Sequence, residues 1–289
     1  MKDQKVVGID IGGTKVHIGV VQRGQVIAEL RIPTAAKSSK EAILRDISDG
    51  IRQVIDPEVV GIGIGVPGLV DEKKGIVFDV QNIPSWTEVR LKQHLERAFE
   101  LPVYITNDAN TYALGEKVYG PGKPYQNMIG VTLGTGIGTG IIANNNLYSG
   151  AFSCAGEFGG MPYLDKTLED YCSGKFFLQA YGTPGDEMQA LANTGDARAI
   201  EAFQQFGHHL GNAIKIMLYA LSPEAIFLGG SVSHCYPFFK EAMHKSVADF
   251  PYRVVTDKLV IEQSEIKHVA VLGAAALFRM RHQPVPDYT

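Results

Sequence analysis

The stretch VVGIDIGGTKVHIGVV, residues 6–21, consists of two short apolar runs separated by a Gly-Gly-Thr turn. A second turn, Arg23-Gly24-Gln25, follows, and a third apolar run then extends to Ile32. Short apolar runs bounded by glycine turns are typical of strands joined as hairpins. The sequence therefore predicts an antiparallel meander of three strands at the start of the chain.

The segments after the meander alternate between helical and strand patterns. From Ser38, a candidate N-cap with Glu41 three residues later, apolar side chains recur at helical spacing. The apolar run 59–66, the helically spaced apolar side chains of 91–99 and the apolar run 103–106 follow. We expect the order strands, helix, strand, helix, strand.

An internal match indicates that this unit is duplicated. GIDIG at 8–12 aligns with GVTLG at 130–134, and in both copies a hydroxyl-bearing turn and a second apolar strand come next. The later part of the chain is mostly helical, with a long amphipathic helix over 197–221, a strand over 225–228 and a closing helix from Val269.

The chain is long enough to divide into two domains. It has 289 residues, 45% of them hydrophobic, which exceeds the size at which a single core usually splits. We expect an N-terminal domain over 1–106 that the C-terminal helix 270–289 completes, and a C-terminal domain over 107–269.

Composition argues against several classes of function. The net charge is −4 and the Lys and Arg residues are scattered, so no basic face is available for nucleic acid. A strand pattern begins within a few residues of Met1 and the longest apolar runs are short and glycine-rich, so we expect neither a signal peptide nor a membrane span. The widely spaced Cys154, Cys172 and Cys235 fit a set of reduced thiols. A cytoplasmic protein is expected.

Three glycine turns at strand ends are candidate phosphate-binding loops. Glycines let a phosphate approach backbone N–H groups, although a hairpin that merely needs glycine is the alternative. The turn at 133–140 leads into a strand and no Gly-Lys-Ser/Thr closes it, which excludes the Rossmann and Walker motifs. The turn at 229–230 would admit a flat ligand such as adenine. The candidate ligand-binding residues are Asp10, Gly12, Gly13, Thr14, Lys15, Gly134, Thr135, Gly136, Gly229 and Gly230.

Polar residues that suit an acceptor site lie where a strand ends and a helix begins. Asp108 there is a candidate base for the proton of an attacking hydroxyl, and Asn107 a candidate partner of neighbouring hydroxyls. A helix cap is an equally good explanation of these two residue types. Glu157 and Glu169 are further carboxylates that can accept paired hydrogen bonds from a polyol. For Glu169 the alternative is a first-turn glutamate that complements the helix dipole.

These motifs together resemble the ROK family of sugar kinases and sugar-responsive repressors over nearly the whole chain. The resemblance implies an α/β, two-domain actin-like (ribonuclease H-like) fold built from duplicated βββαβα units. It also implies ATP with Mg²⁺ as the donor, a hexose bound in the interdomain cleft, and a homodimer. The matching segments are two phosphate motifs at 10–15 and 133–140, a sugar loop at 65–68 that contains Gly68, the catalytic pair Asn107-Asp108, and two glutamate segments at 156–159 and 168–174.

The chain departs from the family pattern at Gly160, where the family usually has a histidine that contacts both the sugar and a structural zinc. No cysteine lies between Glu157 and Glu169, so the thiolates that would complete a tetrahedral zinc site are missing. We expect a protein without zinc that also lacks one of the family's sugar contacts.

The expected reaction is transfer of the ATP γ-phosphate to a hexose, at the 6-hydroxyl of glucose or a related sugar. Asp108 would be the general base and Asp10 would orient hydrated Mg²⁺. Fructose, mannose and N-acetylhexosamines are alternative acceptors, and polyphosphate is an alternative donor. The positions that would hold the sugar are Gly68, Asn107, Glu157 and Glu169.

Two alternatives come from outside the enzymes. One is a sugar-sensing repressor, although the phosphate motif begins at Asp10 and so leaves no room for a preceding DNA-binding domain. The other is a sugar-binding protein that has lost catalysis, against which the presence of Asp108 and both phosphate motifs argues.

Overall fold

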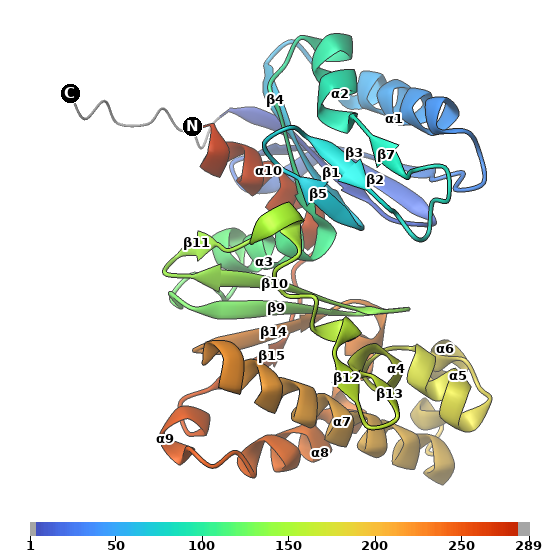
Figure 1. Ribbon diagram of the computed structural model, residues 1–289, viewed down its shortest axis with the longest axis vertical. Helices are drawn as coiled ribbons and strands as arrows, with labels where there is room; N and C mark the ends of the chain where they lie inside the picture. Colours follow the sequence, from blue (N-terminus) through green and yellow to red (C-terminus); the bar gives the residue numbers. More distant parts are fainter. Residues whose placement is uncertain (1–3, 283–289) are drawn as a thin grey trace. The chain divides into compact units, whose positions relative to one another are not determined.

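Two five-stranded sheets with the same strand order organise the chain, which the computed structural model describes over residues 4–282 (Figure 1). Each sheet belongs to one of two compact units. Within the described residues, the first unit comprises 4–123, 147–155 and 266–282, and the second comprises 124–146 and 156–265.

The first sheet has the strand order β3-β2-β1-β4-β8. β1, β2 and β3 pair in antiparallel fashion, which confirms the predicted meander, whereas β4 and β8 continue the sheet in parallel with β1. A small sheet of β5, β6 and β7 follows β4 along the chain. The strands of this unit are β1 (Lys5–Ile11), β2 (Lys15–Gln22), β3 (Gln25–Pro33), β4 (Val59–Val66), β5 (Leu69–Asp71), β6 (Ile76–Phe78), β7 (Glu88–Val89) and β8 (Val103–Asn107).

Helices cover both faces of the first sheet. α1 (Lys40–Val54) and α2 (Leu91–Phe99) share a buried core with one face, and α3 (Asp108–Tyr119) and α10 (Val269–Arg281) pack on the other. Glycine lets α10 approach closely, because a Cβ at Gly8 would lie 2.1 Å from the carbonyl oxygen of Val271. The cap of α1 is Ser39, whose Oγ accepts the N–H of Ala42 at 3.2 Å, so the predicted cap at Ser38 was wrong by one residue.

The second sheet has the order β11-β10-β9-β14-β15. Its strands are β9 (Met128–Leu133), β10 (Ile137–Ala143), β11 (Asn146–Leu147), β14 (Ala225–Gly229) and β15 (Val260–Gln263). The helices of this unit are α4 (Leu168–Cys172), α5 (Lys175–Tyr181), α6 (Gly185–Asn193), α7 (Ala197–Leu221), α8 (Tyr236–Ala248) and α9 (Arg253–Thr256). A ribbon of β12 (Pro162–Tyr163) and β13 (Lys166–Thr167) precedes α4. Short 3₁₀ turns are η1 (Ala151–Ser153) in the first unit and η2 (Phe158–Gly160) and η3 (Ser231–Cys235) in the second.

α7 is the central helix of the second unit, and its bounds are those predicted from the apolar spacing. Phe203 and Phe206 on its buried face have ring centroids 4.6 and 5.3 Å from that of Phe177 on α5. Buried aromatic pairs at such distances contribute through both area and ring geometry. This cluster fixes α5 against α7 beneath the β9–β10 turn.

The predicted duplication is confirmed by the topology. Both sheets place the first strand of the copy at the centre, its hairpin partner on one side and a parallel strand on the other. The matched glycines correspond as well, since Gly8 faces Gly19 across the first hairpin and Gly130 faces Gly140 across the second.

The compact units do not divide at the residue expected from the sequence. α3 lies in the first unit because it packs against α10, where glycines on both helices bring the backbones together: a Cβ at Gly115 would lie 2.2 Å from the carbonyl oxygen of Val269. As a division into domains, 1–106 and 107–269 stay a prediction. Residues 283–289 of the expected terminal helix 270–289 lie outside the described residues.

The prediction that no segment spans a membrane depends on the length and apolarity of the helices. Over residues 4–282, no helix is both long enough and apolar enough to span a bilayer.

Candidate active site

Three parallel strands of the first unit end at one edge and bring the predicted catalytic residues together. In the register of these strands, Asp10 on β1 pairs with Gly65 on β4, and Val66 on β4 pairs with Asn107 on β8. The carboxyl ends of parallel strands are where open α/β sheets commonly bind ligands. Asp10 and the Asn107-Asp108 pair therefore share one edge, although 97 residues separate Asp10 from Asn107 in the sequence.

The turn between β1 and β2 is held by backbone bonds. The N–H of Gly12 donates to the carbonyl of Lys15 at 2.9 Å, and Thr34 Oγ1 donates to the carbonyl of Gly12 at 2.6 Å. Neither Gly12 nor Gly13 has φ in the left-handed region, so backbone conformation does not support the alternative of a hairpin that merely needs glycine. At Gly13 the demand is for space, because a Cβ would lie 2.7 Å from Cβ of Asn82. Thr14 is the remaining residue of this turn.

Asn107 and Asp108 occupy the first turn of α3. Asn107 is the N-cap: its Oδ1 accepts the N–H of Ala109 at 2.9 Å, which confirms the capping interpretation for this residue. Its Nδ2 donates to the carbonyl of Gly68 at 3.2 Å, where φ is 89° and glycine is favoured. Asp108 Oδ1 also lies 2.9 Å from the N–H of Ala109. One hydrogen-bonded group thus fixes the predicted base and two predicted sugar ligands.

The two carboxyl groups of this edge have perturbed acidity. Burial raises the pKa of Asp108, and the bond from Ala109 opposes that shift. Burial also raises the pKa of Asp10, to about 7, with the charge of Asp108 acting in the same direction and Lys15 acting against it. Carboxyl groups with raised pKa values in such surroundings are typical of functional sites.

A buried polar network supports Asn107 and Asp108 from the preceding residue, and no sequence motif indicated it. Thr106 Oγ1 donates to Glu72 Oε1 at 2.6 Å, and Ser153 Oγ donates to the same oxygen at 3.0 Å. Asn110, one turn along α3, donates to Thr106 Oγ1 at 3.0 Å, and Arg281 pairs with Glu72 Oε2 at 2.7 Å. A cavity of about 690 Å³ lies around Glu72 and Arg281, and none of the predicted site residues lines it.

In the second unit, the β9–β10 turn is bonded to the start of α5. The N–H of Gly134 donates to the carbonyl of Gly136 at 2.9 Å, and the N–H of Gly174 donates to the carbonyl of Gly134 at 2.7 Å. Ser173 Oγ donates to the carbonyl of Thr135 at 3.1 Å. These bonds shape the turn that the sequence predicted as the second phosphate motif.

A cavity of about 340 Å³ opens beside this turn. Its size falls within the range of small-ligand sites. Apolar side chains such as Phe177 and Val232 line it together with Lys175, Asp186 and Gln189. Gly230, of the third glycine turn, has φ of 85°, and a Cβ there would lie 2.3 Å from the carbonyl oxygen of Leu133. This lining suits a flat ligand held between apolar side chains, with the ammonium group of Lys175 near one end of the ligand.

Glu169 lies directly behind the β9–β10 turn, in the first turn of α4. Its Oε2 accepts the N–H of Ile137 at 3.3 Å, and a Cβ at Gly136 would lie 2.4 Å from the same oxygen. Its Oε1 is ion-paired with Lys175, a residue that the sequence analysis did not single out. Glu169, one of the two predicted sugar glutamates, is thus joined through Lys175 to the wall of the cavity.

Glu157 precedes the 3₁₀ turn η2 and is exposed. Gly156 before it has φ of 96°, and Thr139 Oγ1 donates to its carbonyl. A Cβ at Gly159 would meet Ile137 at 2.9 Å, whereas one at Gly160 would meet nothing within 4 Å. The structure therefore gives a packing reason for glycine at 159 and none at 160.

The predicted residues form one group in each unit. The first contains Asp10, Gly12, Gly13, Thr14, Lys15, Gly68, Asn107 and Asp108, and the second contains Gly134, Thr135, Gly136, Glu157, Glu169, Gly229 and Gly230.

Comparison with known proteins identifies the family. The model of the ROK family matches residues 6–281. The chain belongs to the ROK family. A glucokinase of Streptomyces coelicolor is 31% identical over 312 aligned positions that cover 94% of this ROK chain and 97% of the relative. The xylose repressor of Bacillus subtilis is 34% identical over 236 positions, which cover 76% of this chain and 61% of the repressor.

A solved structure extends the comparison to the fold. The crystal structure of a ROK family glucokinase from Streptomyces griseus, in complex with glucose and AMPPNP, superposes with a TM-score of 0.81 at 28% identity. The match covers 96% of this ROK chain and 99% of that one. The predicted α/β fold of the actin-like sugar kinases is confirmed.

Proposed function

We propose that this ROK protein is an ATP-dependent hexose kinase that phosphorylates the 6-hydroxyl of glucose or of a related hexose. The observation that carries the proposal is Asp108, a carboxyl group with raised pKa at the carboxyl edge of the first sheet, bonded through Ala109 to the cap that also holds Gly68. The glucokinase relatives and the bound glucose and AMPPNP of the Streptomyces griseus enzyme support it.

Asp108 would accept the proton of the attacking hydroxyl. Phosphoryl transfer asks the protein mainly for positioning, for charge neutralisation and for one such acceptor. Because burial raises its pKa, Asp108 is a stronger proton acceptor than an exposed carboxylate. Asn107, Gly68, Glu157 and Glu169 would hold the hydroxyl groups of the sugar.

The donor site would combine the glycine turns with two charged groups, the ammonium of Lys175 and the carboxylate of Asp10. The cavity beside Gly134, Thr135 and Lys175 suits a nucleotide, and Gly229-Gly230 directly precede Ser231 and Val232, which line it. Mg²⁺ would supply charge neutralisation for the phosphates, and Asp10 is the carboxylate that would hold it through water. We also propose Gly12, Gly13, Thr14 and Lys15 as phosphate-binding residues.

A regulatory protein without catalysis is the second candidate, since xylose repressors are among the relatives. The paired occurrence of an acceptor-side base and a nucleotide-sized cavity favours the kinase. Fructose, mannose and N-acetylhexosamines stay alternative acceptors, and polyphosphate an alternative donor. The homodimer, the cytoplasmic location and the lack of a nucleic-acid partner also stay predictions.

The direct test is a coupled assay of ADP release across a panel of hexoses with ATP and Mg²⁺, with polyphosphate as a second donor. We expect turnover with at least one aldohexose and a requirement for Mg²⁺. No phosphorylation of any sugar with either donor, together with sugar-dependent DNA binding that weakens with salt, would favour the repressor instead.

A further inference from the structure

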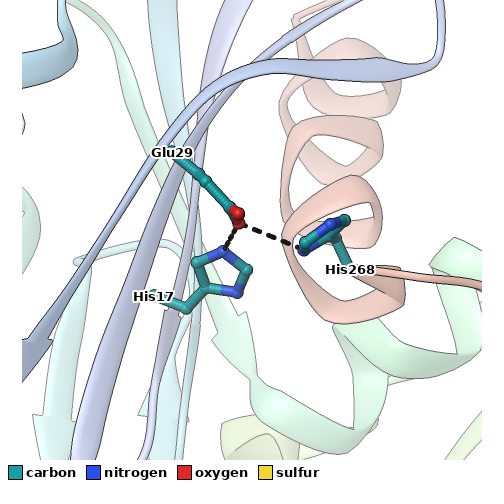
Figure 2. A group of neighbouring side chains, drawn as sticks. All are labelled: His17, Glu29 and His268. Carbon is teal, nitrogen blue, oxygen red and sulfur yellow. Dashed lines mark hydrogen bonds and ion pairs between the residues drawn. The ribbon is translucent and has the colours of Figure 1, made fainter.

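Two histidines and a glutamate of the first unit turn toward one another, as Figure 2 shows. His17 lies on β2, Glu29 on β3, and His268 immediately before α10. His17 Nε2 is 2.6 Å and His268 Nδ1 is 3.2 Å from the same oxygen, Glu29 Oε2. The three candidate ligand atoms all lie within 4.8 Å of one another, and no other such group of His, Cys, Asp and Glu occurs in the part of the chain that the structure describes.

The sheet and helix α10 bring these residues together. In the β2–β3 ladder, Gly19 faces Glu29, and His17 lies two residues before Gly19, so both side chains point to the same face. Helix α10 packs on that face, because a Cβ at Gly19 would lie 2.8 Å from the Val271 side chain. His268, with φ of 58°, starts this helix and so lies over the strands.

A hydrogen bond explains the contact of His17 with Glu29 but not the position of His268. His17 and Glu29 form one at 2.6 Å. His268 Nδ1, however, is buried and makes no hydrogen bond, although it lies only 3.2 Å from the carboxylate. Buried polar atoms without a hydrogen bond are uncommon in folded proteins and call for an explanation. A bound cation that accepts the nitrogen lone pair supplies one.

We propose that His17, Glu29 and His268 bind a divalent transition-metal cation, with Zn²⁺ the first candidate. Imidazole nitrogens and a carboxylate are typical zinc ligands, and three protein ligands leave a fourth position for water. Mg²⁺ prefers oxygen ligands, so the magnesium of a nucleotide would not compete here. The site uses none of the residues assigned to sugar or nucleotide.

Two of the three separations between ligand atoms suit a tetrahedral ion after a small movement, and the third, between the two histidines, lies within 4.8 Å. Zinc bonds of about 2.0–2.1 Å separate neighbouring ligand atoms by about 3.3 Å. The separation of Glu29 and His268 is already 3.2 Å, whereas that of His17 and Glu29 must widen by about 0.7 Å from 2.6 Å. The Glu29 side chain is 42% exposed and can rotate. Arg31, 3.6 Å from the same oxygen, is 53% exposed and can turn into solvent as the cation enters.

This site changes the expectation of a protein without zinc. That expectation concerned the cysteine and histidine positions of the family's zinc, which this chain lacks. A cation held by His17, Glu29 and His268 would instead tie β2 and β3 to the N-cap residue of α10, just after the chain returns from the second unit to the first at residue 266.

The experiment titrates the full-length, chelator-treated protein with Zn²⁺ against a chromophoric chelator, with millimolar Mg²⁺ present, and repeats it with Co²⁺ to record ligand-field absorption. We expect one Zn²⁺ per chain and a Co²⁺ spectrum of low coordination number. Glu29→Gln and His268→Gln should each weaken Zn²⁺ binding by about 100-fold or more, because losing a ligand costs at least as much as altering a residue that only supports one. His244→Gln, an exposed histidine on α8, is the matched control and should bind as the wild type does.

Glu29→Gln keeps the shape of a partly exposed side chain, so it tests the site even if His268→Gln fails to fold. Zn²⁺ should also raise the thermal unfolding midpoint of the wild type but not that of Glu29→Gln. The proposal is overturned if the wild type binds no Zn²⁺ in the micromolar range, or if Glu29→Gln binds it as tightly as the wild type. Neither readout uses kinase activity, so failure here leaves the proposed function unaffected.

Discussion

The charge of Asp108 acts on Asp10 and, with burial as the larger cause, raises the pKa of Asp10 to about 7. Lys15 opposes the shift without cancelling it. Two carboxyl groups kept close together and partly buried weaken the folded state at neutral pH, and such groups are typically retained where a ligand or a reaction needs them. The pair is therefore the best physical marker of function in the first unit.

Asp10→Asn should stabilise the ligand-free protein at neutral and higher pH. Folding raises the pKa of Asp10, so the folded state binds the proton more tightly, and its stability falls as pH rises from the unfolded pKa, about 4, to the folded pKa. Asparagine cannot ionise. The free energy of unfolding of the variant should exceed that of the wild type by up to about 4 kcal/mol near pH 8, with the difference vanishing near pH 4. Urea unfolding over this pH range measures it, and a difference independent of pH would contradict the argument.

Asn107 has two separable tasks, and two variants divide them. Asn107→Ala loses both the cap and the bond to Gly68, so we expect a loss of about 1–2 kcal/mol in unfolding free energy and a raised KM for the hexose. Asn107→Ser keeps a neutral capping oxygen but is too short to donate to the Gly68 carbonyl. It should retain most of the stability and still raise KM. Equal stability losses in the two variants would show that the cap is not what Asn107 supplies.

Lys175 should matter for the nucleotide more than for stability. Its pair with Glu169 is about two-fifths exposed on the lysine side, and exposed ion pairs contribute little, about 0–1 kcal/mol. Because Lys175 lines the 340 Å³ cavity, Lys175→Met should raise the KM for ATP about 10-fold or more while the thermal midpoint changes little. Lys166→Met, which loses only an exposed bond to Gln179, is the control. An unchanged KM for ATP would place the nucleotide elsewhere.

Gly160 and its neighbour Gly159 allow a matched test of the histidine that the family usually has at the position of Gly160. Gly160→His meets no atom at Cβ, so the variant should fold like the wild type, and we expect a lower KM for the hexose if the added imidazole supplies the family's sugar contact. Gly159→His would push a Cβ to 2.9 Å from the Ile137 side chain and should lose about 1–3 kcal/mol of stability. Thermal unfolding and hexose kinetics of both variants measure these effects. Similar destabilisation of the two would contradict the open environment of Gly160.

Local patterns predicted the parts of this protein that depend on local physics. The meander, strand β4, the exact bounds of α7 and the position of Asp108 at a strand end all followed from apolar spacing and turn residues. Contacts between distant residues did not follow. The bond of Thr106 to Glu72 and the grouping of His17 with His268 join side chains whose sequence separation carries no periodic signal.

The glycines show the same limit of sequence-based prediction. The sequence marked Gly12 and Gly13 as turn residues, but the structure gives Gly13 a steric reason that depends on Asn82, about 70 residues away. Likewise, α3 joins the first unit because Gly115 packs against the start of α10. Packing partners of this kind become visible only in three dimensions.

The role of Asp108 is tested by measuring the turnover of Asp108→Asn with the best hexose from the panel, alongside calorimetric binding of the same sugar. The side chain keeps its shape and can still bond to hydroxyl groups, so we expect a turnover lower by roughly 10²–10⁴ with nearly unchanged sugar affinity. Wild-type turnover in Asp108→Asn would contradict the assignment of Asp108 as the base.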